Sequence, residues 1–403
     1  MRRRPELLAS ALRQLDEAAR RRSRAVVAGF GGSNDSAPTV VVDGQSLRNF
    51  CSNDYLALAR HPELAAATAR AAADFGSGSG ASHLVCGHSV EHHALEEELA
   101  AFLGRERALL FSTGYMANLG VISALTARGE VILADRLNHA SLVDGARLSA
   151  AQLQRYAHND VKAATQLFNA HPNASLLTTD GVFSMDGDSA PLAALATLCR
   201  ERESWLMVDD AHGIGVLGET GAGSVQVAGL SASDVPLLVG TLGKAFGSFG
   251  AFVAGDADLI EYVMQHARSY IYTTALPPAV AAASRAALRL VRAEPWRRAH
   301  LAALVARFRA GATRLVSECG EVALLNSSTP IQPLVVGGET RALQLSALLR
   351  TRGFWVSAIR PPTVPAQTSR LRITLSAAHR EADVDDLLAA LALSLRELAP
   401  LAA

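Results

Sequence analysis

Short apolar runs and helical patterns alternate through the middle of the chain. Between about residues 91 and 254, apolar segments predict strands at 108–112, 131–135, 176–180, 205–209, 237–241 and 251–254. Apolar residues at helical spacing lie between these segments, for example over 116–126 and 191–203. This alternation is typical of an α/β domain whose mainly parallel sheet is covered by helices on both faces. Ligands of such sheets bind beyond the carboxyl ends of the strands, so functional side chains are expected there.

The two flanks of this region show different patterns. Leu8, Leu12, Leu15 and Ala19 recur at helical spacing, and the hairpin VVVDGQSLRNF turns at Asp43-Gly44. Residues 277–315 are helical with a break near Glu294-Pro295; strands are then expected at 331–336, 354–356 and 371–375, and helices at 341–352 and 381–397. The predicted division is an N-terminal helix and hairpin (1–48), a large domain (49–290), and a connector helix with a small α+β domain (291–403).

Composition excludes several classes of protein. The chain has 403 residues, of which 49% are hydrophobic and 19% charged, so it can bury a sizeable core and is not disordered. Lys+Arg and Asp+Glu number 38 each, which leaves no broad basic surface for nucleic acid. The sequence contains no apolar run of about 18 residues and starts without a secretory apolar segment, so neither a membrane nor a nucleic-acid partner is expected. The expected location is cytoplasmic.

Cysteine and lysine usage adds two expectations. Cys51, Cys86, Cys199 and Cys319 are scattered, which is typical of buried thiols in a reducing compartment rather than of a zinc site or disulfide frame. Lys162 and Lys244 are the only lysines in a chain with 36 arginines. Because an amine can lose its proton and attack a carbonyl whereas a guanidinium cannot, each retained lysine is a candidate nucleophile. Lys162 opens an amphipathic pattern and is expected at the surface, while Lys244 lies between glycines in Gly240-Thr-Leu-Gly243-Lys244.

Two glycine-rich stretches imitate dinucleotide-binding sites. Gly76-Ser-Gly78-Ser-Gly80-Ala81 follows a helical segment, whereas a dinucleotide motif must follow a strand. The stretch from Gly213 to Gly218 does follow a strand, but more loop residues come next where a helix should begin. A nicotinamide-dependent oxidoreductase is therefore the alternative from a different class of enzyme.

Polar side chains occur where several predicted strands end. Asp209 and His212 follow one strand, His139 follows another, and Gly114-Tyr115 opens a helix whose first N–H groups would suit a phosphate. Taken singly, each fragment also fits a satisfied polar turn or a helix cap.

Together, these fragments resemble the fold-type-I pyridoxal-phosphate (PLP) enzymes, and within them the α-oxoamine synthases. The resemblance extends over about residues 15–395, and the matching stretches include Ser52-Asn-Asp-Tyr-Leu56, Gly78-Ser-Gly80, Tyr156-Ala-His-Asn-Asp160, Gly181-Val-Phe-Ser-Met-Asp-Gly187, Asp209-Asp-Ala-His212 and Ala358-Ile-Arg-Pro-Pro-Thr363. It implies a large domain with a mainly parallel seven-stranded sheet and a smaller α+β C-terminal domain.

The resemblance also implies roles for individual residues. Lys244 would hold PLP and later take the substrate's Cα proton, Asp209 would pair with the pyridine nitrogen, His212 with Ser184 would face the phenolic oxygen, and His139 would stack on the ring. Gly114, Tyr115 and Thr241 would hold the phosphate, joined by Thr274 (or Thr273) of a second subunit. Arg372 would clamp the amino-acid carboxylate, and Asn53, Thr363 and one arginine of residues 20–24, matched at Arg21, would belong to the substrate site. No metal site is expected.

The implied reaction is a decarboxylative condensation of an amino acid with an acyl thioester. The segments VFSMDGDSAPL and AIRPPTVP favour the members that join L-alanine to pimeloyl-CoA or pimeloyl-acyl carrier protein, acting as homodimers with shared active sites. Members that use glycine with acetyl- or succinyl-CoA, or serine with a long acyl-CoA, remain alternatives because pocket size cannot be read from the sequence. A family fold that binds its ligand without turnover is disfavoured, since Lys244, Asp209 and His212 are all present.

Overall fold

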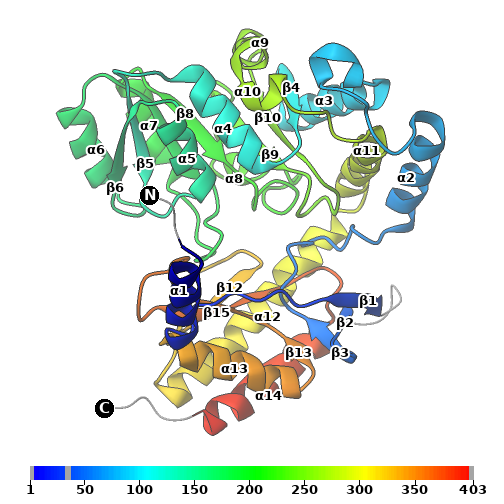
Figure 1. The fold of residues 1–403 in the computed structure, drawn as a ribbon, viewed down its shortest axis with the longest axis vertical. Coiled ribbons are helices and arrows are strands. Elements are labelled where there is room, and N and C mark those ends of the chain that lie inside the picture. The colour runs from blue at the N-terminus through cyan, green and yellow to red at the C-terminus, as the bar shows by residue number, and fades with distance from the viewer. Residues whose placement is uncertain (1–3, 32–37, 399–403) are drawn as a thin grey trace. The chain divides into compact units, whose positions relative to one another are not determined.

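The computed structural model describes residues 4–31 and 38–398 (Figure 1). Residues 1–3 and 32–37 of the predicted N-terminal segment and residues 399–403 lie outside the described part. The chain divides into two compact units. The large unit contains Asn53–Ser184 and Asp188–Ala299, and the small unit contains Met1–Ser52, Met185–Gly187 and His300–Ala403.

The large unit alternates strands and helices as the apolar pattern predicts. Its helices are α2 (Pro62–Phe75), the π-helix η1 (His83–Gly87), α3 (Val90–Leu103), α4 (Gly114–Leu125), α5 (Ala140–Leu148), α6 (Val161–Ala170), α7 (Leu192–Glu201), α8 (Ser224–Val227), α9 (Ala257–His266), α10 (Arg268–Ile271) and α11 (Pro278–Ala293). Its strands are β4 (Arg107–Phe111), β5 (Val131–Asp135), β6 (Gln152–Tyr156), β7 (Ala174–Asp180), β8 (Trp205–Asp209), β9 (Leu237–Thr241) and β10 (Ala251–Gly255).

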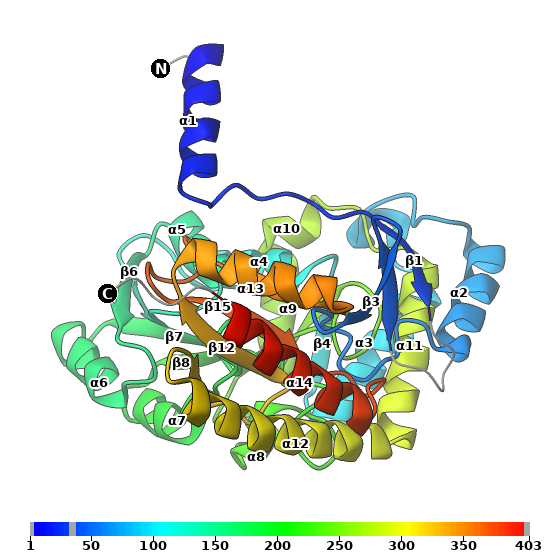
Figure 2. The same ribbon diagram turned by 90° about the horizontal axis from the view of Figure 1, so that it is seen from below.

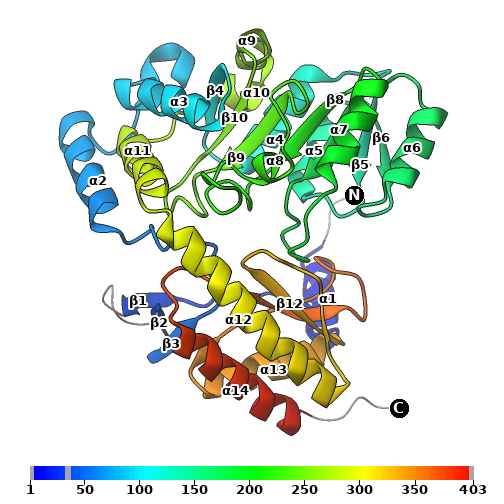
Figure 3. The ribbon, with the colours of Figure 1, turned by 180° about the vertical axis from the view of Figure 1, so that it is seen from behind.

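These strands form one seven-stranded sheet in the order β4-β10-β9-β8-β7-β5-β6. β10 is antiparallel to both neighbours, and the pairs from β9 to β6 are parallel. The mainly parallel sheet is therefore confirmed. β5 is buried along its whole length and β8 is buried after its exposed first residue, Trp205, because α4 and α5 cover one face and α7 lies on the other (Figure 1 and Figure 3). The apolar core behind the α4 face joins Val121 and Ile122 to Ile132, Leu176 and Met207.

The small unit combines the first residues of the chain with the last hundred. It contains α1 (Pro5–Glu17), β1 (Val27–Gly31), β2 (Thr39–Val42), β3 (Gln45–Asn49), most of α12 (Trp296–Cys319), β11 (Ala323–Leu324), β12 (Ile331–Gly337), α13 (Glu339–Thr351), β13 (Phe354–Trp355), β14 (Ser357–Ile359), β15 (Ser369–Thr374) and α14 (Glu381–Glu397). Two four-stranded sheets result, β1-β2-β3-β13 and β11-β12-β15-β14. Figure 2 shows α12, α13 and α14 on the same side of the second sheet.

Local predictions can be compared with this arrangement. The hairpin at Asp43-Gly44 is confirmed: both residues have positive φ, 50° and 75°, as a tight turn between β2 and β3 requires. Strands β6, β1, β11 and β14 were not predicted, and the segment expected at 354–356 ends at Trp355. The expectation of buried thiols is wrong for Cys86, which is exposed; among the four cysteines only Cys199 is fully buried. Among the described residues no helix is both long and apolar enough to cross a membrane.

Candidate active site

Three neighbouring strands of the large unit end in polar residues at the same edge of the sheet. The pairing register places Asp180 at the end of β7 beside Asp209 at the end of β8, and Asp209 beside Val239 of β9. Thr241 ends β9, and Lys244 follows three residues later. Because these strands are parallel, their carboxyl ends meet at one edge, which is where ligands of such sheets bind.

Lys244 is half-buried and its amine contacts a histidine. Its Nζ lies 2.9 Å from Nε2 of His212, which is buried in the turn after β8. The other ring nitrogen of His212, Nδ1, lies 2.7 Å from the hydroxyl of the fully buried Tyr55. That hydroxyl is also within 3.3 Å of Asn53 Oδ1. The amine, imidazole and phenol therefore form a continuous row of hydrogen-bonding groups.

The protonation of this row depends on Lys244. An ammonium can only donate, so His212 Nε2 then accepts, Nδ1–H donates to Tyr55, and Tyr55 donates to Asn53. A neutral amine can accept from Nε2–H, and Tyr55 then donates to Nδ1. The row thus accommodates both states of the amine through a change of His212 tautomer.

A second network fixes Asp209 relative to His139. Asn118, buried in α4, donates from Nδ2 to Asp209 Oδ2 at 2.6 Å and to Ser141 Oγ at 2.8 Å. Ser141 Oγ lies 2.7 Å from His139 Nδ1. Asp209 is 6% exposed, and its other oxygen accepts from the backbone N–H of Ala211 at 3.1 Å. A buried carboxylate is thereby held in one orientation by neutral donors.

His139 precedes α5 and caps that helix. The ring Nδ1 of His139 accepts from the backbone N–H of Ser141 at 3.3 Å. The backbone N–H of His139 donates to Asp180 Oδ2 at 2.7 Å. Although the residue keeps an exposed surface, desolvation of the imidazole lowers the pKa of His139, and this outweighs the opposite effect of Asp209. The ring is therefore neutral at pH 7. His139 therefore both caps α5 and contributes its ring to the candidate active site.

Asp210 organises the loop that carries His212. It is fully buried, and its Oδ2 accepts from the backbone N–H of Ser224 at 2.7 Å. A Cβ on Gly213 would lie 2.1 Å from Asp210 Oδ1, and one on Gly223 would lie 2.0 Å from Oδ2. Only glycine fits at both positions, so the glycines serve to pack this carboxyl group. Burial raises the pKa of Asp210 to about 7.

The start of α4 offers an open N-terminus. Thr113 caps the helix by accepting from the backbone N–H of Met116 at 3.2 Å. A Cβ built on Gly114 would meet nothing within 4 Å, so space is free beside the first turn. The first N–H groups of a helix have no partner within the helix and favour an anion. Nearby in the same unit, Thr241 Oγ1 accepts from the N–H of Gly243 at 3.2 Å.

For the remaining residues expected around the cofactor, the structure gives their exposure and backbone contacts. Ser184 is partly buried at the end of the first segment of the large unit. Thr274 is exposed, pairs with Ser82 in an isolated antiparallel bridge, and its carbonyl accepts from Ser112 Oγ at 3.5 Å. Lys162 is exposed at the start of α6, as predicted.

Three residues expected to bind substrate belong to the small unit. Arg372 is 7% exposed in β15, and its Nη1 donates to Thr374 Oγ1 at 3.2 Å. Arg21 pairs with Asp16 at 2.7 Å. It is Arg22 that donates to Thr363 Oγ1, at 3.0 Å, and Arg20 pairs with Glu339.

Sequence reasoning missed the residues that support the expected ones. Tyr55, Asn118, Ser141, Asp180 and Asp210 contact His212, Asp209, His139 or their loop, yet none was predicted to do so. A signal existed only for Asn118, which lies one helical turn after Gly114-Tyr115 and on the side of α4 that faces the sheet. The loop after His212 contains only the four-residue helix α8, so the dinucleotide alternative lacks the helix it needs.

These groups suit a flat, phosphate-bearing aldehyde with a basic ring nitrogen. Lys244 supplies an amine that can react with the aldehyde, and Asp209 supplies a buried carboxylate that can pair with a protonated ring nitrogen. The open start of α4 has room for the phosphate. The donor set therefore fits PLP.

Comparisons with known proteins agree with this fit. The family model described as aminotransferase class I and II matches residues 46–391. An 8-amino-7-oxononanoate synthase from Cellvibrio japonicus is 60% identical over 352 residues, 87% of each chain. A structure of serine palmitoyltransferase with its PLP internal aldimine superposes with a TM-score of 0.89 at 28% identity, over 98% of each chain. The structure of an 8-amino-7-oxononanoate synthase from Francisella tularensis matches with a TM-score of 0.76 at 31% identity, over 87% of this chain and 98% of that one.

Proposed function

The chain belongs to the class I and II aminotransferases and, among them, to the 8-amino-7-oxononanoate synthases, and on this basis we propose how its residues carry out the reaction. It is a PLP-dependent acyltransferase of biotin synthesis. The reaction joins L-alanine to a pimeloyl thioester, releasing CO2 and the free thiol. Bound PLP supplies a protonated pyridine ring that accepts the electron pair left on the amino-acid Cα.

Lys244 has two successive tasks in this proposal. Its Nζ, when neutral, would hold the cofactor, and when free of the cofactor it would take the proton from the substrate Cα. Once Nζ carries that proton, His212 Nε2 at 2.9 Å accepts a hydrogen bond from it. His212 Nδ1–H then donates to Tyr55, so the row of three groups stabilises the protonated amine. The position of Lys244 in this row is the observation that carries the proposal.

Asp209 and His139 orient the reacting groups from opposite ends of the Asn118–Ser141 network. The Asp209 carboxylate would favour a protonated ring nitrogen in the bound cofactor, because a buried anion favours a cationic partner. The neutral His139 ring, held by Ser141 Oγ, would offer its flat face to the cofactor. The first N–H groups of α4, together with Thr241, would hold the phosphate.

In the small unit we assign the substrate carboxylate to Arg372. Its guanidinium is buried in β15, and a planar guanidinium binds a carboxylate through two parallel hydrogen bonds. We assign the acyl substrate to the Arg22–Thr363 pair together with Arg21, since Arg22 is the arginine that reaches Thr363. We further propose a homodimer in which Thr273 or Thr274 of a second copy completes the phosphate site.

Turnover measurements test the substrate assignment. Alanine, glycine and serine are each supplied with pimeloyl, acetyl, succinyl and palmitoyl thioesters, and pimeloyl is presented both on CoA and on acyl carrier protein. We expect the highest kcat/KM for alanine with a pimeloyl thioester. Equal or better activity with glycine and acetyl-CoA would overturn the assignment.

A further inference from the structure

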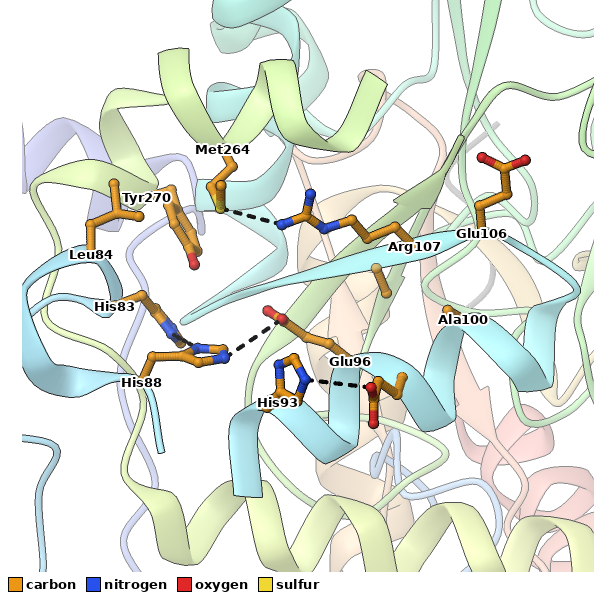
Figure 4. A pocket seen from close by; sticks show the side chains of 12 residues that line it. His83, Leu84, His88, His93, Glu96, Ala100, Glu106, Arg107, Met264 and Tyr270 are labelled. Atoms are coloured by element: carbon orange, nitrogen blue, oxygen red, sulfur yellow. Dashed lines mark hydrogen bonds and ion pairs between the residues drawn. The ribbon is translucent and has the colours of Figure 1, made fainter. Parts of the chain in front are cut away.

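A cluster of histidines lines a cavity of the large unit and takes no part in the chemistry described above. The cavity has a volume of about 310 Å³ and is lined by His83, His88, His93, Glu96 and Tyr270, among others (Figure 4). A fourth histidine ring, that of His92, is fully buried beside His83 and His88.

The π-helix brings two of these rings onto one face. In η1 (His83–Gly87) the chain completes a wide turn, and His88 follows directly. Nδ1 of His83 lies 2.9 Å from Nδ1 of His88. His92, in the first turn of α3, places its ring centroid 5.0 Å from that of His83 and 5.7 Å from that of His88.

The outer nitrogens of two rings already face suitable acceptors. His92 Nε2 lies 2.6 Å from the carbonyl oxygen of Leu276, and since a carbonyl only accepts, this nitrogen carries the proton. His88 Nε2 lies 4.0 Å from Glu96 Oε2. Histidines that bind metals donate their second N–H to a carbonyl or carboxylate, as His92 does to Leu276.

The rings are also in the uncharged state that a metal requires. Burial lowers the pKa of His83 to about 3, and the neighbouring His92 and His88 contribute to this lowering. Burial likewise lowers the pKa of His88 and of His92. At pH 7 each ring therefore keeps one nitrogen lone pair available.

We propose that His83, His88 and His92 bind a divalent transition-metal ion of the zinc class. One ligand nitrogen from each ring lies within 4.8 Å of the others. Two nitrogens bound tetrahedrally at about 2.0 Å lie roughly 3.3 Å apart, so the His83–His88 pair needs to open by only a few tenths of an ångström. Imidazole ligands suit zinc, copper and nickel, and a water from the cavity can take the fourth position.

Binding leaves the charge of the ligands unchanged. The proton shared between His83 and His88 moves to the outer nitrogen of the ring that holds it. His92 binds through Nδ1 and gives up two hydrogen bonds from Ser89, one from its backbone N–H at 3.0 Å and one from its hydroxyl at 2.8 Å.

Zn²⁺ titration of the PLP-loaded, chelator-treated enzyme tests the proposal. Cys86 is changed to serine in every sample, because its exposed thiol could bind Zn²⁺ by itself. Calorimetry should find one equivalent of Zn²⁺ and a melting temperature that rises with its concentration. We expect His83→Gln and His88→Gln each to weaken binding at least tenfold, and the double variant at least a hundredfold.

His93→Gln is the matched control, because His93 is exposed and pairs with Glu97 at 3.4 Å. We expect it to bind Zn²⁺ like the parent protein. All variants are first compared without Zn²⁺ for melting temperature and condensation activity, which separates loss of the site from loss of the fold. Absence of Zn²⁺ binding, or unchanged affinity in a folded double variant, would overturn the proposal.

Discussion

At the scale of single residues, the position of each reactive side chain is fixed by a hydrogen bond to a supporting residue. Tyr55 is hydrogen-bonded to His212, which contacts the amine of Lys244. Asn118 is hydrogen-bonded to Asp209 and, through Ser141, is connected to His139. Because a buried polar group without its partner costs free energy, each supporting residue restricts the position of the group in front of it.

The first prediction concerns Tyr55. Replacing it with phenylalanine removes the hydroxyl 2.7 Å from His212 Nδ1, and with it the control of the His212 tautomer. One hydrogen bond contributes about 0.5–1.5 kcal/mol, so kcat should fall about 2- to 10-fold and its pH profile should shift, with little change in the KM for alanine. Tyr262→Phe, an exposed tyrosine stacked on His266, is the control. A kcat and pH profile like those of the parent enzyme would remove Tyr55 from the mechanism.

A second prediction at this scale concerns Arg372. Arg372→Ala should raise the KM for alanine about 10- to 100-fold, because a hydrogen bond to a charged group contributes about 1.5–3 kcal/mol. The KM for the thioester should change little. Arg200→Ala, which removes an exposed ion pair with Asp234, serves as the control. The opposite pattern of KM changes would assign Arg372 to the acyl substrate.

At the scale of elements, the strands that carry the site could be predicted from the sequence, but the residues that hold the site's side chains in position could not. The bounds of β5, β8 and β9 match the predicted ones, because strands that are buried over most of their length appear as nearly continuous apolar runs. β6 was missed because it is an edge strand, half-exposed, with the polar residues Gln152, Gln154 and Arg155. The contact between Tyr55 and His212 spans 157 residues of sequence, and no local pattern indicates a pairing of that kind.

The loop after β8 gives a prediction at the scale of an element. Asp210 keeps its proton to a pH of about 7 in the folded enzyme, whereas its ordinary pKa is 3.8. Between these values the folded state binds the extra proton, so raising the pH from about 4 to 7 should reduce the stability of the parent enzyme relative to Asp210→Asn. The difference in the free energy of unfolding between the two proteins should change by about 4 kcal/mol at most, and it should stay constant above pH 7.

Melting temperatures of both proteins between pH 4.5 and 8 check this prediction. Asp234→Asn is the matched control: hydrogen bonds from Ser231 lower the pKa of Asp234, so the difference caused by that variant should stay constant over the same range. A constant difference for Asp210→Asn as well would show that Asp210 is ionised in the fold.

At the scale of the whole chain, segments far apart in sequence share one unit. β3 pairs in parallel with β13, joining Arg48 to Phe354, and the Arg48 side chain bonds to Asp386 of α14 at 2.6 Å. The sequence predicts most elements of both ends, but their association depends on contacts more than 300 residues apart. Composition and local periodicity do not predict contacts of this kind.

The proposed homodimer is tested at this scale. Light scattering of the purified holoenzyme should give twice the chain mass of 42.3 kDa over a wide range of concentration. Thr273→Ala and Thr274→Ala, examined separately, should identify the hydroxyl that supports the phosphate, through weaker retention of PLP on dialysis. A monomer that retains full activity would contradict a shared active site.

The most direct test of the account is the site of cofactor attachment. The holoenzyme is reduced with borohydride, digested, and its peptides are mapped by mass spectrometry. We expect one reduced pyridoxal phosphate adduct, on Lys244 in the turn after β9. An adduct on Lys162 at the start of α6, or an enzyme that turns over with no adduct on either lysine, would contradict it.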